Sequence, residues 1–358
     1  ATTEIYTLSL HDALPICRVS EASKPYIGGQ AVIEGVMMRA PGCLSVAVRK
    51  PDGAIAVREG PLRSKVAGNK LAKLPFLRGV ATLVESLSIG YGALRFSAEQ
   101  QLTDEEREKA GASSGGGMMM LTTLLALGLF MAAPQLAAEG TSRLFGIELA
   151  VDRWQFHALT GGFKLLIFTL YLFGISRLPE IRRVFQYHGA EHKTIFAYEA
   201  GLPLTVENVQ KQSTLHPRCG TTFLVVVIFV SVVAGSFVTP LLMPEWATGR
   251  FEQNVITLLV RIALLPPVAA ISYELQRLSA RFCTTAPLQV LLWPGFLFQK
   301  ITTREPDDAQ VEIAIAAMRA AMWREANAEA KADEEPLVFE SFSSFLEGVE
   351  SSLRPKSA

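Results

Sequence analysis

Four long apolar stretches constrain this chain more than any other feature of its sequence. They cover about Met118–Ala138, Phe156–Ser176, Thr221–Met243 and Val255–Tyr273. A helix of about 20 apolar residues crosses the hydrocarbon core of a bilayer, so each stretch predicts a transmembrane helix. A fifth stretch, Ala286–Phe298, is too short to cross and carries two prolines, which predicts an interfacial or re-entrant segment. The sequence therefore predicts an α-helical polytopic membrane protein with about four spans.

Composition agrees with a protein that lies partly in a membrane. The chain has 358 residues, 49% hydrophobic and 19% charged, and its mean hydropathy is +0.27. It is too apolar for an ordinary soluble domain and too charged for a wholly embedded one. The formal net charge is zero, so no nucleic-acid partner is expected. The cysteines lack C-x-x-C spacing, which is typical of a reducing compartment: Cys17, Cys43, Cys219 and Cys283.

The distribution of basic residues predicts the orientation of the spans. The segment between the second and third spans is rich in them: Arg177, Arg182, Arg183, Lys193, Lys211 and Arg218. The other two loops between spans contain only Arg143, Arg153 and Arg250. Because cytoplasmic loops carry an excess of Lys and Arg, both termini and the segment 177–220 are expected in the cytoplasm.

The residues before the first span predict a small folded region. Residues 1–17 contain His11–Ile16, which resembles the translation of a sequencing-library adapter, and we interpret them as an artefact. Residues 26–110 are expected to form a cytosolic β-hairpin and helix region. Three strands separated by Pro/Gly turns are predicted over Ala31–Met38, Leu44–Arg49 and Ala54–Glu59. A helix is predicted to follow over Phe76–Gln100.

The remaining chain divides into three parts. Residues 111–298 predict a membrane domain interrupted by the cytosolic segment 177–220. Residues 299–332 predict a cytosolic helix that begins near Ala309, where Asp307 and Asp308 can cap it. Residues 333–358 are expected to be a weakly ordered tail.

The string His188-Gly189-Ala190-Glu191-His192 lies on a predicted helix, for which Pro179 is a plausible start and Ile181–Ala200 has helical composition. Residues four apart share a helix face, so both histidines can point at one spot with Glu191 beside them. Two imidazoles with a carboxylate are how proteins hold a catalytic zinc and its base, and H-x-x-E-H is the order in inverzincin metalloproteases. The predicted metal ligands are His188 and His192, completed by Glu199, His216 or Cys219.

Three interpretations of this cluster remain open. In a catalytic site, Glu191 takes the proton of a metal-bound water, and the metal polarises a carbonyl or phosphoryl group. A set of three histidines and one cysteine would instead be closed, as in structural zinc sites. The simplest alternative is hydrogen-bonded packing, in which Cys219 is a buried apolar residue.

Two basic residues fall inside predicted spans: Lys164 near the middle of the second and Arg261 a third of the way into the fourth. None of the four spans as bounded above contains an acid to pair with them. Such charges are costly and usually face a cavity, a ligand or headgroups. They predict an intramembrane polar site beside Pro266-Pro267, or side chains that snorkel to the surface. The alternative function is a transporter or assembly factor, and four spans suggest a homo-oligomer for a transporter.

Five motifs resemble the YqhQ-like family of bacterial membrane proteins: Gly28–Arg39, His188–Lys193, His216–Thr221, Ser272–Glu274 and Ile301–Pro306. The resemblance covers Tyr26 to Met318. It implies a bacterial inner-membrane protein of a family labelled as predicted metal-dependent enzymes, and it supplies no substrate or reaction. Together with the motifs, it leads us to expect a hydrolase-like enzyme with a divalent metal, zinc, favoured by a thiolate ligand. The expected partners are membrane lipid and a lipid-linked or membrane-associated substrate.

Overall fold

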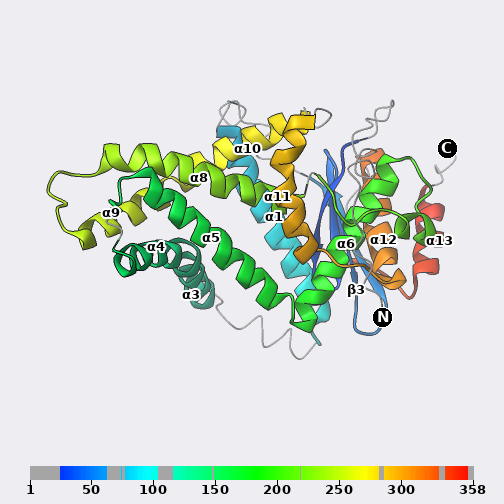
Figure 1. Cartoon of the computed structure of the whole chain (residues 1–358). Coiled ribbons are helices and arrows are strands. Elements are labelled where there is room, and N and C mark those ends of the chain that lie inside the picture. The colour runs from blue at the N-terminus through cyan, green and yellow to red at the C-terminus, as the bar shows by residue number, and fades with distance from the viewer. Residues whose placement is uncertain are drawn as a thin grey trace, which may run out of the picture.

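The computed structural model describes residues 25–62, 74, 77–103, 116–146, 149–217, 219–281, 286–329 and 335–353. A helical bundle lies at one end of the molecule, and a β-sheet covered by helices lies at the other (Figure 1). The prediction of a mostly helical chain with a small N-terminal sheet is confirmed. The predicted artefact, residues 1–17, lies outside the described residues.

The sheet has five antiparallel strands in the order of the chain. They are β1 (Gly28–Val32), β2 (Gly35–Arg39), β3 (Cys43–Arg49), β4 (Ile55–Pro61) and β5 (Leu337–Phe339). The predictions of single strands over Leu44–Arg49 and Ala54–Glu59 are close to β3 and β4. The prediction of one strand over Ala31–Met38 is wrong, because a hairpin turn at Ile33 and Glu34 divides it into β1 and β2.

Glu34 shows why this hairpin was not evident from the sequence. Its φ is +51°, a left-handed backbone conformation that residues other than glycine seldom adopt. Arg183 donates two hydrogen bonds of 2.5 Å to its carboxylate, and the Tyr187 hydroxyl donates a third of 3.2 Å. Both partners lie about 150 residues further along the chain. These long-range contacts stabilise a turn that local propensity does not predict.

Helices cover both faces of the sheet. Helices α6 (Pro179–Glu199) and α12 (Asp308–Ala326) pack on one face, and α1 (Leu77–Gln101) packs on the other. Alanines let α12 approach β3 closely, so that Ser45 Oγ donates to the carbonyl oxygen of Ala317 at 2.6 Å. Asp307 caps α12 as expected, because its carboxylate accepts a hydrogen bond from the backbone N–H of Gln310.

The C-terminal segment is more ordered than the tail predicted over 333–358. Strand β5 pairs with β4, and helix α13 (Phe342–Leu353) follows it. Phe345 is buried in the core beneath the sheet, where its ring meets those of Phe339 and Phe342. Aromatic residues at Phe339, Phe342 and Phe345 were the signal for this structure, since an apolar face must find a partner.

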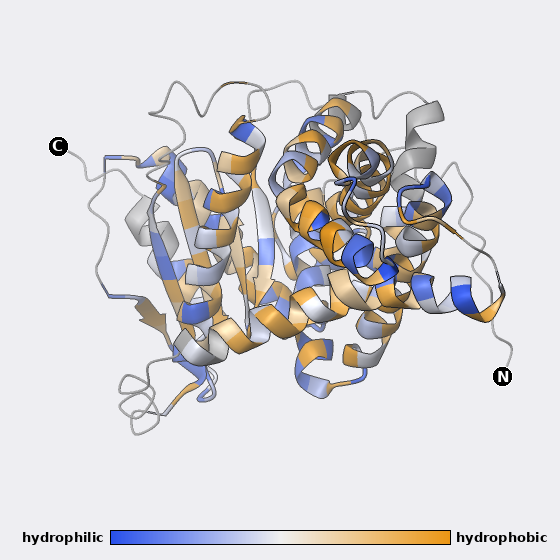
Figure 2. Cartoon of the chain, turned by 90° about the vertical axis from the view of Figure 1, so that its left-hand side faces the viewer, coloured by the Kyte–Doolittle hydropathy of each residue, from blue (hydrophilic) through white to orange (hydrophobic). Residues whose placement is uncertain are grey.

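The bundle contains the predicted spans. Its elements are α3 (Gly116–Leu127), the π-helical η3 (Gly128–Ala132), α4 (Ala133–Leu144), α5 (Trp154–Ile175), α8 (Gly220–Leu242), α9 (Arg250–Ala263), α10 (Leu265–Arg281) and α11 (Ala286–Thr302). Within the described part of the chain, three helices are long and apolar enough to cross a membrane: Met120–Leu144, Trp154–Ile175 and Gly220–Leu242. Helices α9 and α10 supply a fourth if the pair forms one broken span. Hydrophobic residues cover much of these helices (Figure 2).

Prolines account for two irregularities in the bundle. Pro134 has no N–H to donate to the preceding turn, and the π-helical segment ends just before it, at Ala132. Helices α9 and α10 meet at an angle of 49° around Leu264. Pro266 and Pro267 lie in the first turn of α10, where a missing N–H is tolerated, so the chain restarts a helix there rather than continuing α9. Both irregularities border the same part of the bundle interior.

Candidate metal centre

The His188–His192 string lies where the two ends of the molecule meet. Helix α6 carries it, and the first residues of α8 and the last residues of α11 approach it from the bundle. The Gln299 side chain of α11 binds both the N–H and the carbonyl of His216, each at 2.8 Å, which holds the chain just before α8. The site is therefore formed by elements from both ends.

Each histidine of the string is fixed by a backbone carbonyl. His188 Nδ1 lies 2.9 Å from the carbonyl oxygen of Thr302, and His192 Nδ1 lies 2.5 Å from that of Thr214. A carbonyl oxygen only accepts, so each Nδ1 carries the hydrogen and each Nε2 keeps its lone pair in the neutral ring. This is how metal-binding histidines are usually oriented.

Cys219 completes a group of three. One ligand atom from each of His188, His192 and Cys219 lies within 4.8 Å of the others. His188 Nε2 is 3.3 Å from Cys219 Sγ, close to the separation of two ligands around a tetrahedral zinc. Cys219 is the N-cap of α8, where the helix dipole favours negative charge. The donor types and spacing therefore fit zinc after small side-chain adjustments.

Glu191 lies beside this group in a buried position. Its side chain is 6% exposed, and its Oε2 is 4.0 Å from His188 Nε2. Burial raises the pKa of Glu191 above its usual range, and the nearby His188 and His216 partly oppose this. Gly29 of β1 packs on it so tightly that a Cβ there would lie 2.8 Å from Glu191 Cγ. The start of the Gly28–Arg39 motif thus forms one wall of the site.

The other two predicted ligands lie outside the group of three. His216 Nε2 is 3.7 Å from Glu199 Oε2, and the ring packs on Phe196 with centroids 4.6 Å apart. The ring centroids of His216 and His192 are 5.5 Å apart. Burial lowers the pKa of His216 to about 4 and also lowers that of His192, so both rings are neutral at neutral pH. His216 and Glu199 therefore border the group without joining it.

Three neighbours of the site were missed at the level of sequence. Thr302 and Thr214 act through backbone carbonyls, which no side-chain pattern reveals. Gly189 is the third: a Cβ there would lie 2.0 Å from the carbonyl oxygen of Arg304. Because Gly189 has no Cβ, the chain after α11 can pass close to α6, where Arg304 N–H donates to the carbonyl of Phe185 at 2.9 Å. The Ile301–Pro306 motif was the available signal.

The two basic residues of the predicted intramembrane polar site also lie together. Lys164 and Arg261 line one cavity of about 360 Å³ among α5, α8, α9 and α10. His157, which sequence analysis did not single out, lines it as well, and Arg261 Nη2 donates to its Nδ1 at 3.0 Å. This cavity is separate from the group of His188, His192 and Cys219.

Comparison with known proteins places the chain in a family. Residues 74–324 match a family described as "Protein of unknown function (DUF1385)". The chain belongs to this family. The "Uncharacterized protein YqhQ" of Bacillus subtilis (strain 168) is 37% identical over 303 residues, which cover 81% of this chain and 90% of the relative. No solved structure matches. The YqhQ-like membership predicted from the five motifs is confirmed, and the matched residues include the whole group of three.

Proposed function

We propose that this chain is a zinc-dependent, hydrolase-like enzyme of the bacterial inner membrane that acts at the cytosolic membrane face. The observation that carries the proposal is the orientation of the two histidines. Carbonyl oxygens of Thr302 and Thr214 hold Nδ1 of each ring, which leaves Nε2 unprotonated beside Cys219. A group packed only for stability does not need both rings in the same tautomer next to a thiol.

The residues around the group suit hydrolysis. His188, His192 and Cys219 would hold the zinc ion, which would lower the pKa of a bound water and polarise a carbonyl or phosphoryl oxygen. Three protein ligands leave a coordination position open, as catalytic sites require. Glu191, 4.0 Å from His188, is placed to accept a proton from water. Glu191 is buried, and Gly29 packs against its side chain.

The location suggests the class of substrate. Cys219 of this group is the N-cap of the apolar helix α8, and Thr302, whose carbonyl oxygen binds His188, ends α11. The excess of basic residues over 177–220 favours a cytoplasmic position for this end of the bundle and for both termini. A lipid-linked or membrane-associated substrate, presented among membrane lipids, therefore suits the site better than a soluble one.

Metal content tests the proposal directly. The full chain is purified in detergent without chelator, and zinc per chain is measured by mass spectrometry. We expect about one zinc per chain, at least about tenfold less for His188→Ala, His192→Ala or Cys219→Ser, and an unchanged content for Glu191→Gln, because loss of one ligand typically destroys a three-ligand site. His216→Ala is the matched control and should keep its zinc. A wild-type protein without metal, or histidine variants that retain it, would contradict the proposal.

A transporter or assembly factor is the second candidate, favoured by the cavity that holds Lys164 and Arg261. In that function the group of three has a structural role and holds the cytosolic end together. A homo-oligomer then supplies the additional spans that a transporter needs. Activity separates the two candidates. Glu191→Gln should abolish hydrolysis of a membrane-associated substrate while zinc is retained, whereas in a structural site the same variant changes neither transport nor metal content.

A further inference from the structure

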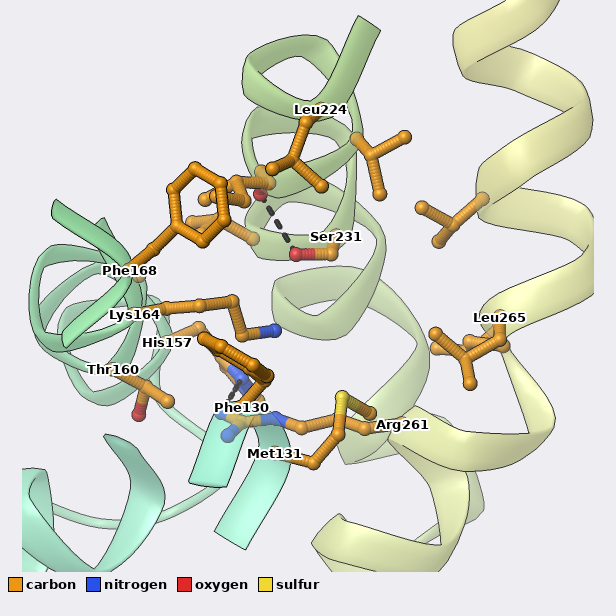
Figure 3. Close-up of a pocket in the computed structure, with 16 residues that line it drawn as sticks. Phe130, Met131, His157, Thr160, Lys164, Phe168, Leu224, Ser231, Arg261 and Leu265 are labelled. Atoms are coloured by element: carbon orange, nitrogen blue, oxygen red, sulfur yellow. Dashed lines mark hydrogen bonds between the residues drawn. The ribbon is translucent and has the colours of Figure 1, made fainter. Parts of the chain in front are cut away.

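The cavity in the bundle holds two positive charges without a balancing acid. Lys164 from α5 and Arg261 from α9 line it, and its sixteen lining residues include no Asp or Glu. Figure 3 shows the side chains of Lys164, His157 and Arg261 extending into the same space. Most of the other lining residues are apolar, among them Phe130, Phe168, Leu224 and Leu265. Unbalanced charges in apolar surroundings are costly, so a counter-ion is required.

The acid in the polar network near Arg261 is already engaged. Arg261 Nη1 donates to Gln135 Oε1 at 3.1 Å, and the Gln135 amide donates to Asn254. The Asn254 amide donates to the carboxylate of Glu139. That carboxylate forms ion pairs with Arg143 at 2.8 Å and with Arg250 at 3.0 Å. This network therefore contains one carboxylate and, besides Arg261, two more cations. It fixes the position of Arg261 but does not neutralise it.

Lys164 and His157 offer donors that the protein does not use. Lys164 Nζ forms no hydrogen bond or ion pair with any residue that the structure describes. Arg261 can only donate, so the bond to His157 makes Nδ1 the acceptor and places the imidazole hydrogen on Nε2. That Nε2 is buried and has no partner among the described residues. An unpaired buried donor costs free energy unless a ligand accepts from it.

We propose that this cavity binds a phosphate monoester, either on a membrane lipid or as a free anion, between Lys164 and Arg261, with His157 Nε2 as a further donor. A phosphate monoester carries about −1.5 to −2 charges at neutral pH, which matches the two cations. Its oxygens accept several charge-assisted hydrogen bonds at once. The volume of about 360 Å³ falls within the range of small-ligand sites. A carboxylate would leave one of the two charges unbalanced.

Two probes distinguish the sources of the phosphate. The full chain is reconstituted in nanodiscs of phosphatidylcholine with a minor fraction of phosphatidic acid, and retained lipid is measured by native mass spectrometry. Separately, inorganic phosphate is titrated calorimetrically into the chain in detergent. Retention of phosphatidic acid alone assigns a lipid, and binding of inorganic phosphate assigns a free anion. Lys164→Met should weaken binding of the active probe by about tenfold or more, the loss expected for one charge-assisted hydrogen bond.

Lys211→Met is the matched control, because it removes the same charge from an exposed side chain that pairs with Glu207. It should bind either probe as the wild type does. Absence of binding by the wild type in both arms, or equal binding by Lys164→Met, overturns the proposal. If Lys164→Met fails to fold, the melting temperature of the wild-type protein is the deciding measurement. The probe that it binds should raise its melting temperature more than the matched control does, which is chloride of equal ionic strength for inorganic phosphate and phosphatidylcholine for phosphatidic acid, and an equal effect of probe and control overturns the proposal. Zinc content is a separate readout, so failure here leaves the metal centre untouched.

Discussion

Replacing Gly189 by alanine is expected to destabilise the protein and, under the proposed zinc-dependent function, to lower its zinc content. A glycine-to-alanine change inside a helix usually stabilises by about 0.5–1 kcal/mol. At Gly189, however, the added Cβ would lie 2.0 Å from the carbonyl oxygen of Arg304, which is backbone. Overpacking of this kind costs about 1–3 kcal/mol and occasionally more, so the net effect should reverse sign. The chain after α11 must then move away from α6.

The loss of zinc follows from the same displacement. Thr302, two residues before Arg304, holds the His188 ring through its carbonyl oxygen. If this segment moves, the ring loses the acceptor that sets its tautomer. The measurements are thermal unfolding in detergent and zinc content. Gly92→Ala is the matched control in α1, where a Cβ meets nothing within 4 Å, and it should leave zinc unchanged and stability equal or higher. A Gly189→Ala protein as stable and zinc-loaded as wild type would contradict the close approach.

Glu59→Ala is expected to be among the most destabilising single substitutions in the sheet. Glu59 of β4 and Arg324 of α12 form an ion pair at 3.1 Å, with side chains only 8% and 2% exposed. Removing one partner leaves a buried charge uncompensated, which costs about 3–5 kcal/mol. We expect a correspondingly lower denaturant midpoint for the variant, measured by urea unfolding of the full chain.

The double substitution Glu59→Leu with Arg324→Met separates the pair from the packing. Since buried ion pairs are often replaceable by apolar residues at little cost, this protein should recover most of the stability lost in Glu59→Ala. The exposed pair of Arg95 and Glu99 on α1 is the control, because solvent screens this pair and Glu99→Ala should change the denaturant midpoint far less. If Glu59→Ala behaves like Glu99→Ala, the burial of this pair is not what stabilises the α12–β4 contact.

The elements that the sequence predicted well are those with local signals. The stretch Phe156–Ser176 corresponds to α5 within two residues, because a long apolar run has few alternatives to a helix. The start of α6 at Pro179 and that of α12 after Asp307 follow from proline at N1 and from an N-cap carboxylate. Such signals act within one turn and do not depend on the rest of the fold.

The elements that it missed depend on distant partners. The turn at Glu34 requires Arg183 and Tyr187, and strand β5 requires the edge of β4. The choice among candidate ligands is of the same kind. Glu199 and His192 share α6, yet Glu199 meets His216, because Gln299 holds the chain before α8 at that place. No spacing rule along the chain contains this information.

By itself, the sequence determined the apolar helices, the helical pairing of His188 with His192, and the membership in the family, since each depends on neighbours a few residues apart or on motifs in order. Only the tertiary structure decided that Cys219 joins these histidines, and that Lys164, His157 and Arg261 share one cavity. The physical reason is that side chains from different helices meet only where backbones pack closely. Here that packing depends on glycines, on buried amides and on carbonyl oxygens that carry no sequence signature.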